Sequence, residues 1–244
     1  MKIKLSNIVS ITILLLFLIF IVVFDKEIES ALREYFDKSS FISSIPLYTY
    51  LLEHIKIVFF SSILSIFIGF TIGLFITTKG GEILKEPILD IIKIGQAFPS
   101  VAILALLIPF IGYGITGVVI ALIMYSLMPI IYNTYIGINN IDKDVIEGAM
   151  GMGLNEWQLY YLVKLPLAAT IIISGIRTAV VVNISAVTLA AAVGAGGLGV
   201  LIVNGVRTFD TVMILRGAVP VALLALICEI LFIEIENRFF VNKW

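Results

Sequence analysis

Long, nearly uncharged apolar stretches recur along the chain and constrain its fold more than any other feature. They occupy residues 5–24, 55–77, 115–138 and 166–193. The hydrocarbon layer of a bilayer is about 30 Å thick, so a helix needs about 20 apolar residues to cross it. Apolar residues make up 60% of the 244 residues, and the mean hydropathy is +1.13. No packed core of this size hides so much apolar surface from water. We therefore expect an all-α polytopic membrane protein.

The polar segments between these stretches set the expected topology. Residues 25–54 carry many acids and form an external connector, partly an amphipathic helix, whereas 139–164 is too charged to lie in lipid. Pro87 suits the first turn of a third helix, which Pro99 and Pro109 interrupt. We expect about six crossing helices, at residues 5–24, 55–77, 87–111, 115–138, 166–193 and 212–235.

The distribution of basic residues gives the expected orientation, because Lys and Arg are more frequent in cytoplasmic loops. A cytoplasmic N-terminus also places the connector at 139–164 and the C-terminus in the cytoplasm, and it leaves Arg177 within the membrane. The basic residues then expected inside are Lys2, Lys4, Lys79, Lys85, Lys93, Lys143, Lys164, Arg238 and Lys243. Those expected outside are fewer, namely Lys26, Arg33, Lys38, Lys56, Arg207 and Arg216.

Composition also excludes several classes of function. The net charge is -1, which gives no sign of a nucleic-acid partner. Cys228 is the single cysteine and His54 the single histidine, so the chain has no internal disulfide and no Cys- or His-based metal or catalytic cluster. No G-x-x-x-x-G-K-[ST] loop occurs, so any ATP-driven step must come from a partner. We expect no catalytic residue, no metal and no cofactor in this chain.

Two glycine patterns need interpretation. Gly69 and Gly73, four positions apart, either let two helices approach closely or reflect chance in an apolar helix. Gly194, Gly196 and Gly199 match G-x-G-x-x-G, but the residues before them continue a membrane helix, and the acid expected about 20 positions later is missing. We interpret this cluster as a tight turn or a close helix approach.

The connector at 139–164 and the start of the next helix contain the most informative motif: Glu147, Gly148, Ala149, Gly153, Val163, Leu165 and Pro166. It resembles the E-A-A-x-x-x-G signature of ABC-importer permeases, which is followed nine residues later by I-x-L-P. Gly148 replaces the first alanine and Val163 replaces the isoleucine. The resemblance implies that these residues couple the chain to a cytoplasmic ATPase.

A physical interpretation stands beside this resemblance. A short amphipathic helix with Ala149 and Gly153 on one face can sit in a groove of a cytoplasmic partner, with Glu147 at the rim. Pro166 then starts the next membrane helix. The alternative is a solvated loop followed by a helix-starting proline.

The resemblance extends over residues 55–235 and is most specific to osmoprotectant permeases, the glycine betaine, carnitine and choline class. The stretches that carry it are 95–100, 109–114, 175–178 and 194–199. It implies a type I ABC importer permease fold with a cytoplasmic coupling helix. The expected domains are an anchor with its external connector at 1–54, a permease core at 55–235 and a short cytoplasmic tail at 236–244.

The same resemblance implies the partners. They are cytoplasmic ATPase subunits that hold ATP and Mg, a second permease chain, identical or paralogous, and a separate extracytoplasmic solute-binding protein. Membrane lipid surrounds the chain, and the implied location is the inner or cell membrane of a bacterium or archaeon.

Polar and kinked positions within the helices are candidates for a translocation path: Gln96, Phe98, Pro99, Arg177, Asn183 and Thr188. Each also has a structural interpretation, since polar side chains in membranes commonly hydrogen-bond between helices. Arg177 in particular serves either the path or a structural link to backbone carbonyls or to Glu229.

The expected function is that of a transport subunit without covalent chemistry of its own. The resemblance implies an ATP-driven importer of osmoprotectant-like quaternary ammonium solutes. The alternative is a secondary transporter or channel driven by an ion gradient, for which Glu229 is the one clear intramembrane acid.

Overall fold

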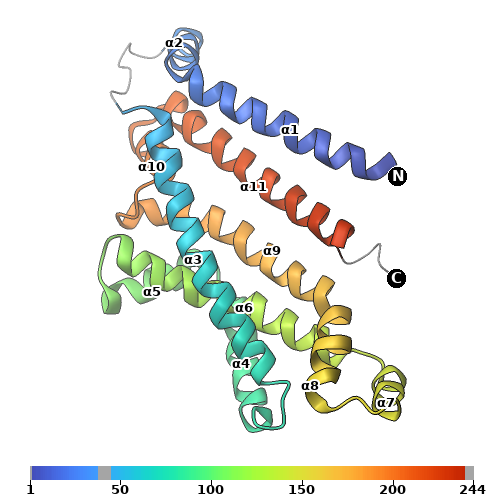
Figure 1. Ribbon diagram of the computed structural model, residues 1–244. Coiled ribbons are helices and arrows are strands. Elements are labelled where there is room, and N and C mark those ends of the chain that lie inside the picture. The colour runs from blue at the N-terminus through green and yellow to red at the C-terminus, as the bar shows by residue number, and fades with distance from the viewer. Residues whose placement is uncertain (1, 38–44, 240–244) are drawn as a thin grey trace.

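The computed structural model describes residues 2–37 and 45–239, and within these ranges every regular element is a helix (Figure 1). The elements are α1 (Lys2–Val23), α2 (Asp25–Tyr35), α3 (Leu47–Phe75), α4 (Glu82–Ala97), α5 (Ser100–Ile111), α6 (Ile115–Asn139), α7 (Lys143–Gly151), α8 (Glu156–Gln158), the π-helical turn η1 (Leu159–Lys164), α9 (Leu165–Ala190), the 3-10 turn η2 (Ala191–Val193), α10 (Gly199–Thr208) and α11 (Thr211–Phe239). This confirms the all-α class.

The number of spans differs from the expected six. In the described part of the chain, four helical segments are long and apolar enough to cross a membrane: α3, α6, the run Glu156–Val193, and α11. The pair α1 and α2, bent by 79°, makes a fifth if it is counted as one broken span. The expected helix at 87–111 is two shorter helices, α4 and α5, which separate at Phe98 and Pro99.

Two expected helix starts are wrong. Pro87 lies inside α4, which already begins at Glu82, so it is not in the first turn. Helix α3 begins at Leu47 rather than near residue 55, directly after Pro46 in an extended conformation. Residues 47–54, expected in the external connector, therefore belong to a membrane helix, and the expected domain boundary at 54 falls within it.

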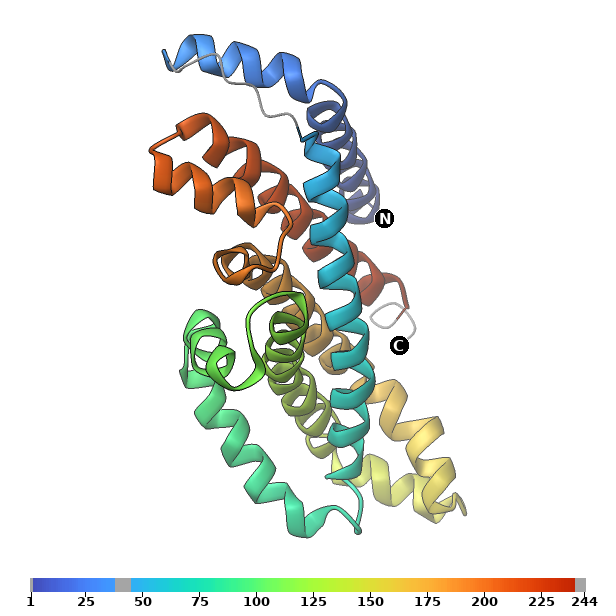
Figure 2. The same cartoon turned by 90° about the vertical axis from the view of Figure 1, so that its left-hand side faces the viewer.

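Glycines bring α3, α6 and α9 into close contact. A Cβ atom at Gly73 would lie 2.6 Å from the Thr134 Cβ of α6, and one at Gly69 would lie 3.0 Å from the Ile130 Cβ. Gly175 of α9 faces α6 in the same way. The packing interpretation of Gly69 and Gly73 is thus confirmed, and Figure 2 shows α3 lying against the other two helices.

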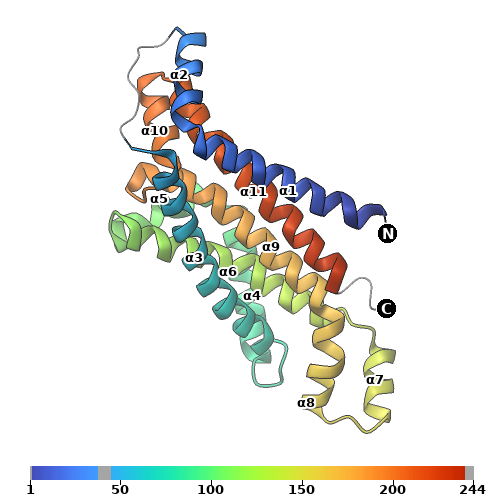
Figure 3. The same ribbon diagram turned by 45° about the horizontal axis from the view of Figure 1, so that its top comes forward.

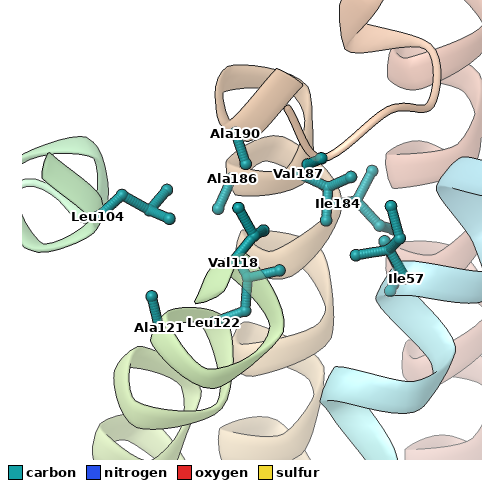
Figure 4. Close-up of a cluster of buried hydrophobic side chains, with 11 residues drawn as sticks. Ile57, Leu104, Val118, Ala121, Leu122, Ile184, Ala186, Val187 and Ala190 are labelled. Carbon is teal, nitrogen blue, oxygen red and sulfur yellow. The ribbon is translucent and has the colours of Figure 1, made fainter. Parts of the chain in front are cut away.

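The main apolar core lies where these helices meet α5. Its labelled members are Ile57, Leu104, Val118, Ala121, Leu122, Ile184, Ala186, Val187 and Ala190 (Figure 4). Small alanines alternate with branched side chains, which lets the helices interdigitate at short separation. This core holds α6 and α9, the two helices that lead into and out of α7 and α8.

The helix ends define two sides of the molecule. Helices α7 and α8 project together beyond the ends of α6 and α9, as Figure 3 shows. Helices α2 and α10 lie at the opposite end (Figure 1). The motif-bearing connector therefore forms a separate projection on one side of the helix bundle.

Candidate functional site

Helix α7 is defined by a signal at each end. Asp142 caps its N-terminus, where its carboxylate accepts the N–H of Asp144 at 3.0 Å. Gly153 ends it in the left-handed conformation, with φ +85°. The N–H of Gly153 donates to the Met150 carbonyl at 2.9 Å, and that of Leu154 donates to the Ala149 carbonyl at 3.4 Å. This is a Schellman cap, so Gly153 stops the helix.

The buried and exposed residues of α7 are not the ones that the sequence predicts. Ala149 is only 3% exposed and packs within its own chain, where α7 contacts η1, so it does not face a partner's groove. The exposed residues of α7 include Val145, Glu147, Gly148 and Met150. Nothing lies within 4 Å of a Cβ placed at Gly148 or Gly153. The surface open to a partner is therefore this exposed face.

The second half of the connector leads directly into α9. Asn155 and Gln158 form a capping box at the start of α8. The π-helical turn η1 follows and contains Val163, and α9 begins at Leu165. Pro166 occupies the start of α9, but the continuous helical run begins at Glu156. The motif residues thus lie on one continuous structural unit, and their coupling role stays a prediction.

Arg177 forms ion pairs with helix α11. Its guanidinium lies 3.5 Å from the Glu229 carboxylate and 3.7 Å from that of Glu236, and it donates to the Ser174 hydroxyl at 3.2 Å. A charge within a membrane protein needs such partners. The link to Glu229 is therefore present, and the suggested role of Arg177 in the path stays a prediction.

Asn183 is the centre of a buried polar cluster. Its side chain is fully buried, accepts a hydrogen bond from Ser126 at 2.6 Å, and donates to Ser61 at 3.3 Å and Ser62 at 3.1 Å. These bonds join α3, α6 and α9. Thr188 donates to the Ile184 carbonyl of its own helix at 3.2 Å. Within this chain Asn183 and Thr188 make structural bonds.

The remaining path candidates lie at the break between α4 and α5. Gln96, Phe98 and Pro99 are all exposed there. Among the described residues, no hydrogen bond or ion pair joins them to Arg177, Asn183 or Thr188. The structure therefore separates the candidates. Gln96, Phe98 and Pro99 are exposed at the break, whereas Arg177, Asn183 and Thr188 lie on α9.

The glycine cluster makes the turn between α9 and α10. Gly194, Gly196 and Gly197 all have positive φ, and the N–H of Gly197 donates to the Glu53 carboxylate of α3 at 3.1 Å. Helices flank the turn on both sides, so it is not a strand-based dinucleotide site. The clustered glycines serve a tight turn, as expected.

A buried charge network joins α2 to the end of the molecule that holds α10. Arg216 contacts both oxygens of Asp25 at 2.6 Å and lies 2.9 Å from the Glu29 carboxylate. Arg33 lies 2.9 Å from Glu29 and 3.0 Å from Asp210. This network is not predicted from the sequence, because a charged connector at 25–54 is expected to face water. The signal was the four-residue spacing of Asp25, Glu29 and Arg33, which places them on one helical face.

Asp210 has a perturbed pKa in this network. Burial alone would raise the pKa of its carboxyl group. The backbone N–H groups of Met213 and Val212, together with the Arg33 guanidinium, outweigh burial and lower the pKa below its ordinary value. Asp210 therefore holds its negative charge at neutral pH and caps α11.

Comparison with known proteins places these features in a family. The model of the binding-protein-dependent transport system inner membrane component matches residues 69–243. The carnitine transport permease protein OpuCB of Listeria monocytogenes is 39% identical over 186 residues, which cover 76% of this chain and 84% of that protein. The glycine betaine/carnitine/choline transport system permease protein OpuCB of Bacillus subtilis is 37% identical over 188 residues, covering 76% and 85%. The osmoprotectant import permease protein OsmW of Salmonella typhimurium is 33% identical over 198 residues, covering 79% and 89%.

Solved structures share the fold. A chain of the MetNI methionine ABC transporter, in an inward-facing conformation, aligns with a TM-score of 0.63 at 24% identity, covering 78% of this chain and 94% of that one. An amino acid ABC transporter crystallised with histidines aligns with a TM-score of 0.66 at 18% identity, covering 79% and 93%. These likenesses confirm the expected type I ABC importer permease fold. By sequence, the chain belongs to the family of binding-protein-dependent transport system inner membrane components.

Proposed function

We propose that this chain is the permease subunit of an ATP-driven importer for quaternary ammonium osmoprotectants of the glycine betaine, carnitine and choline class. The observation that carries the substrate class is the 33–39% identity to permeases of such solutes, over most of their length. The chain itself moves the solute and performs no covalent chemistry. The ion-gradient alternative loses support, because Glu229 faces Arg177.

Coupling to a separate ATPase is proposed for the connector at 145–166. Support comes from the exposed face of α7, where Val145, Glu147 and Met150 are open to a partner while Ala149 fastens the helix to its own chain. An exposed surface that combines apolar Val145 and Met150 with charged side chains suits contact with a globular subunit. ATP and Mg would be held by that subunit, and the chain would pass its movement to α6 and α9.

The other partners follow from the same family. We propose a second permease chain and an extracytoplasmic solute-binding protein, because the family is described as binding-protein-dependent. The proposed location is the inner membrane of a bacterial or archaeal cell, with α7 and both termini in the cytoplasm.

Purification and reconstitution test this function. The tagged chain, extracted gently from its membrane, should co-purify with an ATPase, and the complex with its solute-binding protein in liposomes should take up radiolabelled glycine betaine, carnitine or choline only with ATP. Glu147→Ala and Gly153→Trp should abolish coupling and leave the chain inserted. Asp144→Ala, an exposed acid on the same helix, is the matched control. A complex without ATPase that moves solute under an ion gradient would contradict the proposal.

A further inference from the structure

We propose that Tyr160 joins the coupling connector to the end of α3, so that α3 moves together with α7. This inference rests on the proposed function. Along the chain, α7 is connected only to α6 and, through α8 and η1, to α9, so the covalent chain transmits a movement of α7 only to these two helices. Tyr160 and Thr77 lie 83 positions apart in sequence, and their contact adds a third helix.

The contact is directional. The Tyr160 hydroxyl donates to the Thr77 backbone carbonyl at 2.7 Å, and the Thr77 hydroxyl oxygen lies 3.2 Å from the Tyr160 oxygen. The Thr77 hydroxyl in turn contacts the Leu74 carbonyl at 2.7 Å. Helix α3 ends at Phe75, and the carbonyls beyond a helix end lack helical partners. Tyr160 therefore occupies a position that the end of α3 leaves open.

Packing holds the Tyr160 ring at a junction of three helices. The ring packs against the cluster of Ile138 from α6 and Ala168 and Ile172 from α9, which also contacts Leu74 of α3. A half-buried ring in such a cluster cannot swing freely without losing contacts. The hydroxyl is thus presented to α3 by side chains of the two helices that the connector joins.

A second contact supports the same connection. The Lys79 ammonium lies 2.5 Å from the Glu156 carboxylate, so the turn after α3 meets the start of α8. Both side chains are largely exposed, and an exposed ion pair contributes little energy. Its value here is to limit sliding between the two segments, whereas Tyr160 supplies the firmer bond.

Tyr160 also lies within η1, the π-helical turn between the connector and α9. Single π-helical turns are uncommon and frequently occur at functional positions. The turn aims Tyr160 at α3, while the next residue, Tyr161, is 62% exposed and stacks on Trp157. Adjacent tyrosines thus have different surroundings, which provides a matched pair for experiment.

The test compares Tyr160→Phe with Tyr161→Phe in the reconstituted complex of permease, ATPase and solute-binding protein. Tyr160→Phe keeps the ring and removes the hydroxyl, so assembly and basal ATPase activity should stay unchanged. Solute transported per ATP hydrolysed should fall about three- to tenfold, the range of one hydrogen bond. Tyr161→Phe should match the wild type. An unchanged ratio in Tyr160→Phe, together with loss of coupling in Gly153→Trp, would overturn this inference alone. Absence of ATP-driven transport by the wild type would instead overturn the proposed function.

A rescue experiment separates linkage from folding. In a Cys228→Ser background, Lys79→Cys and Glu156→Cys provide two thiols that a short bismaleimide can bridge, because the native side chains already meet. Bridging should restore the transport ratio of Tyr160→Phe toward the wild-type value. Failure of an efficient cross-link to restore it would show that a fixed connection to α3 does not carry coupling.

Discussion

The buried network around Arg216 allows a quantitative test of how α1 and α2 are attached to the core. Replacing Arg216 by methionine keeps an apolar stem of similar length and removes the guanidinium from between Asp25 and Glu29. Asp25 loses two contacts of 2.6 Å, and Glu29 loses one of 2.9 Å. Their side chains are only 8% and 0% exposed, so water does not replace the lost partner.

The expected cost follows from this geometry. Removing one partner of a buried ion pair destabilises a protein by about 3–5 kcal/mol, because the other charge stays buried and uncompensated. Glu29 keeps Arg33 at 2.9 Å, and Asp25 keeps the Leu47 N–H at 2.9 Å, which places the expectation at about 3 kcal/mol. Adding Asp25→Asn to Arg216→Met removes the orphaned charge and should recover at least about 2 kcal/mol.

The measurement is the free energy of unfolding in mixed micelles with increasing SDS, followed by circular dichroism. Arg207→Met is the control, since Arg207 is an exposed arginine in the last turn of α10. It should change stability by less than about 0.5 kcal/mol. A cost below about 1 kcal/mol for Arg216→Met, or strictly additive costs in the double variant, would refute the reasoning.

The remaining predictions concern single positions. Gly73→Ala should destabilise by about 1–3 kcal/mol in the same unfolding assay, because the new Cβ would meet Thr134 at 2.6 Å; an unchanged value would contradict the close contact. Gly148→Ala should keep full ATP-driven transport and stabilise α7 by up to about 1 kcal/mol, since the site is open and helical. Gly153→Asn should retain more transport than Gly153→Val, because asparagine tolerates φ +85° better; equal loss would favour an effect of side-chain bulk. The lowered pKa of Asp210 stabilises the fold above its unfolded pKa of about 4, and this contribution disappears as the pH falls through the folded value. Unfolding followed from about pH 6 to about pH 3 should therefore show a smaller acid loss in Asp210→Asn than in the wild type.

The membrane helices flanking the connector could be predicted from sequence because hydrophobic length sets them directly. The expected 115–138 became Ile115–Asn139, and the expected start at 166 became Leu165. The expected start of α3 lies too late because the residues after Leu47 mix polar and apolar side chains. What fixes its start is distant, since Asp25 accepts the Leu47 N–H at 2.9 Å. A bond across 22 positions leaves no local signal.

The burial and pairing of the polar side chains could not be predicted from the sequence for a related reason. Charge in a sequence ordinarily indicates contact with water. Glu29 and Arg216 are instead buried because each finds an opposite charge on another helix. Asn183 likewise has its three serine partners on α3 and α6. Which polar residue is structural depends on tertiary contacts that spacing alone does not determine.

The coupling motif combines two kinds of residue that its sequence pattern does not separate. Gly153 ends α7 and Ala149 is buried within its own chain, so both act within the chain. Glu147 and Gly148 lie on the outer face, where a partner has access. A helix with no buried face would rotate when a partner moves against it and would not transmit the force. Under the proposed coupling role, one face is anchored next to the turn that carries Tyr160, so we expect a force on the other face to move α9, and with it α3, as one body. Under the proposed coupling role, the small residues would serve the transmission of force as well as docking. Substitutions on the two faces should then fail differently: inner ones by loosening α7, and loss of the Glu147 carboxylate on the outer face by weakening the association with the ATPase.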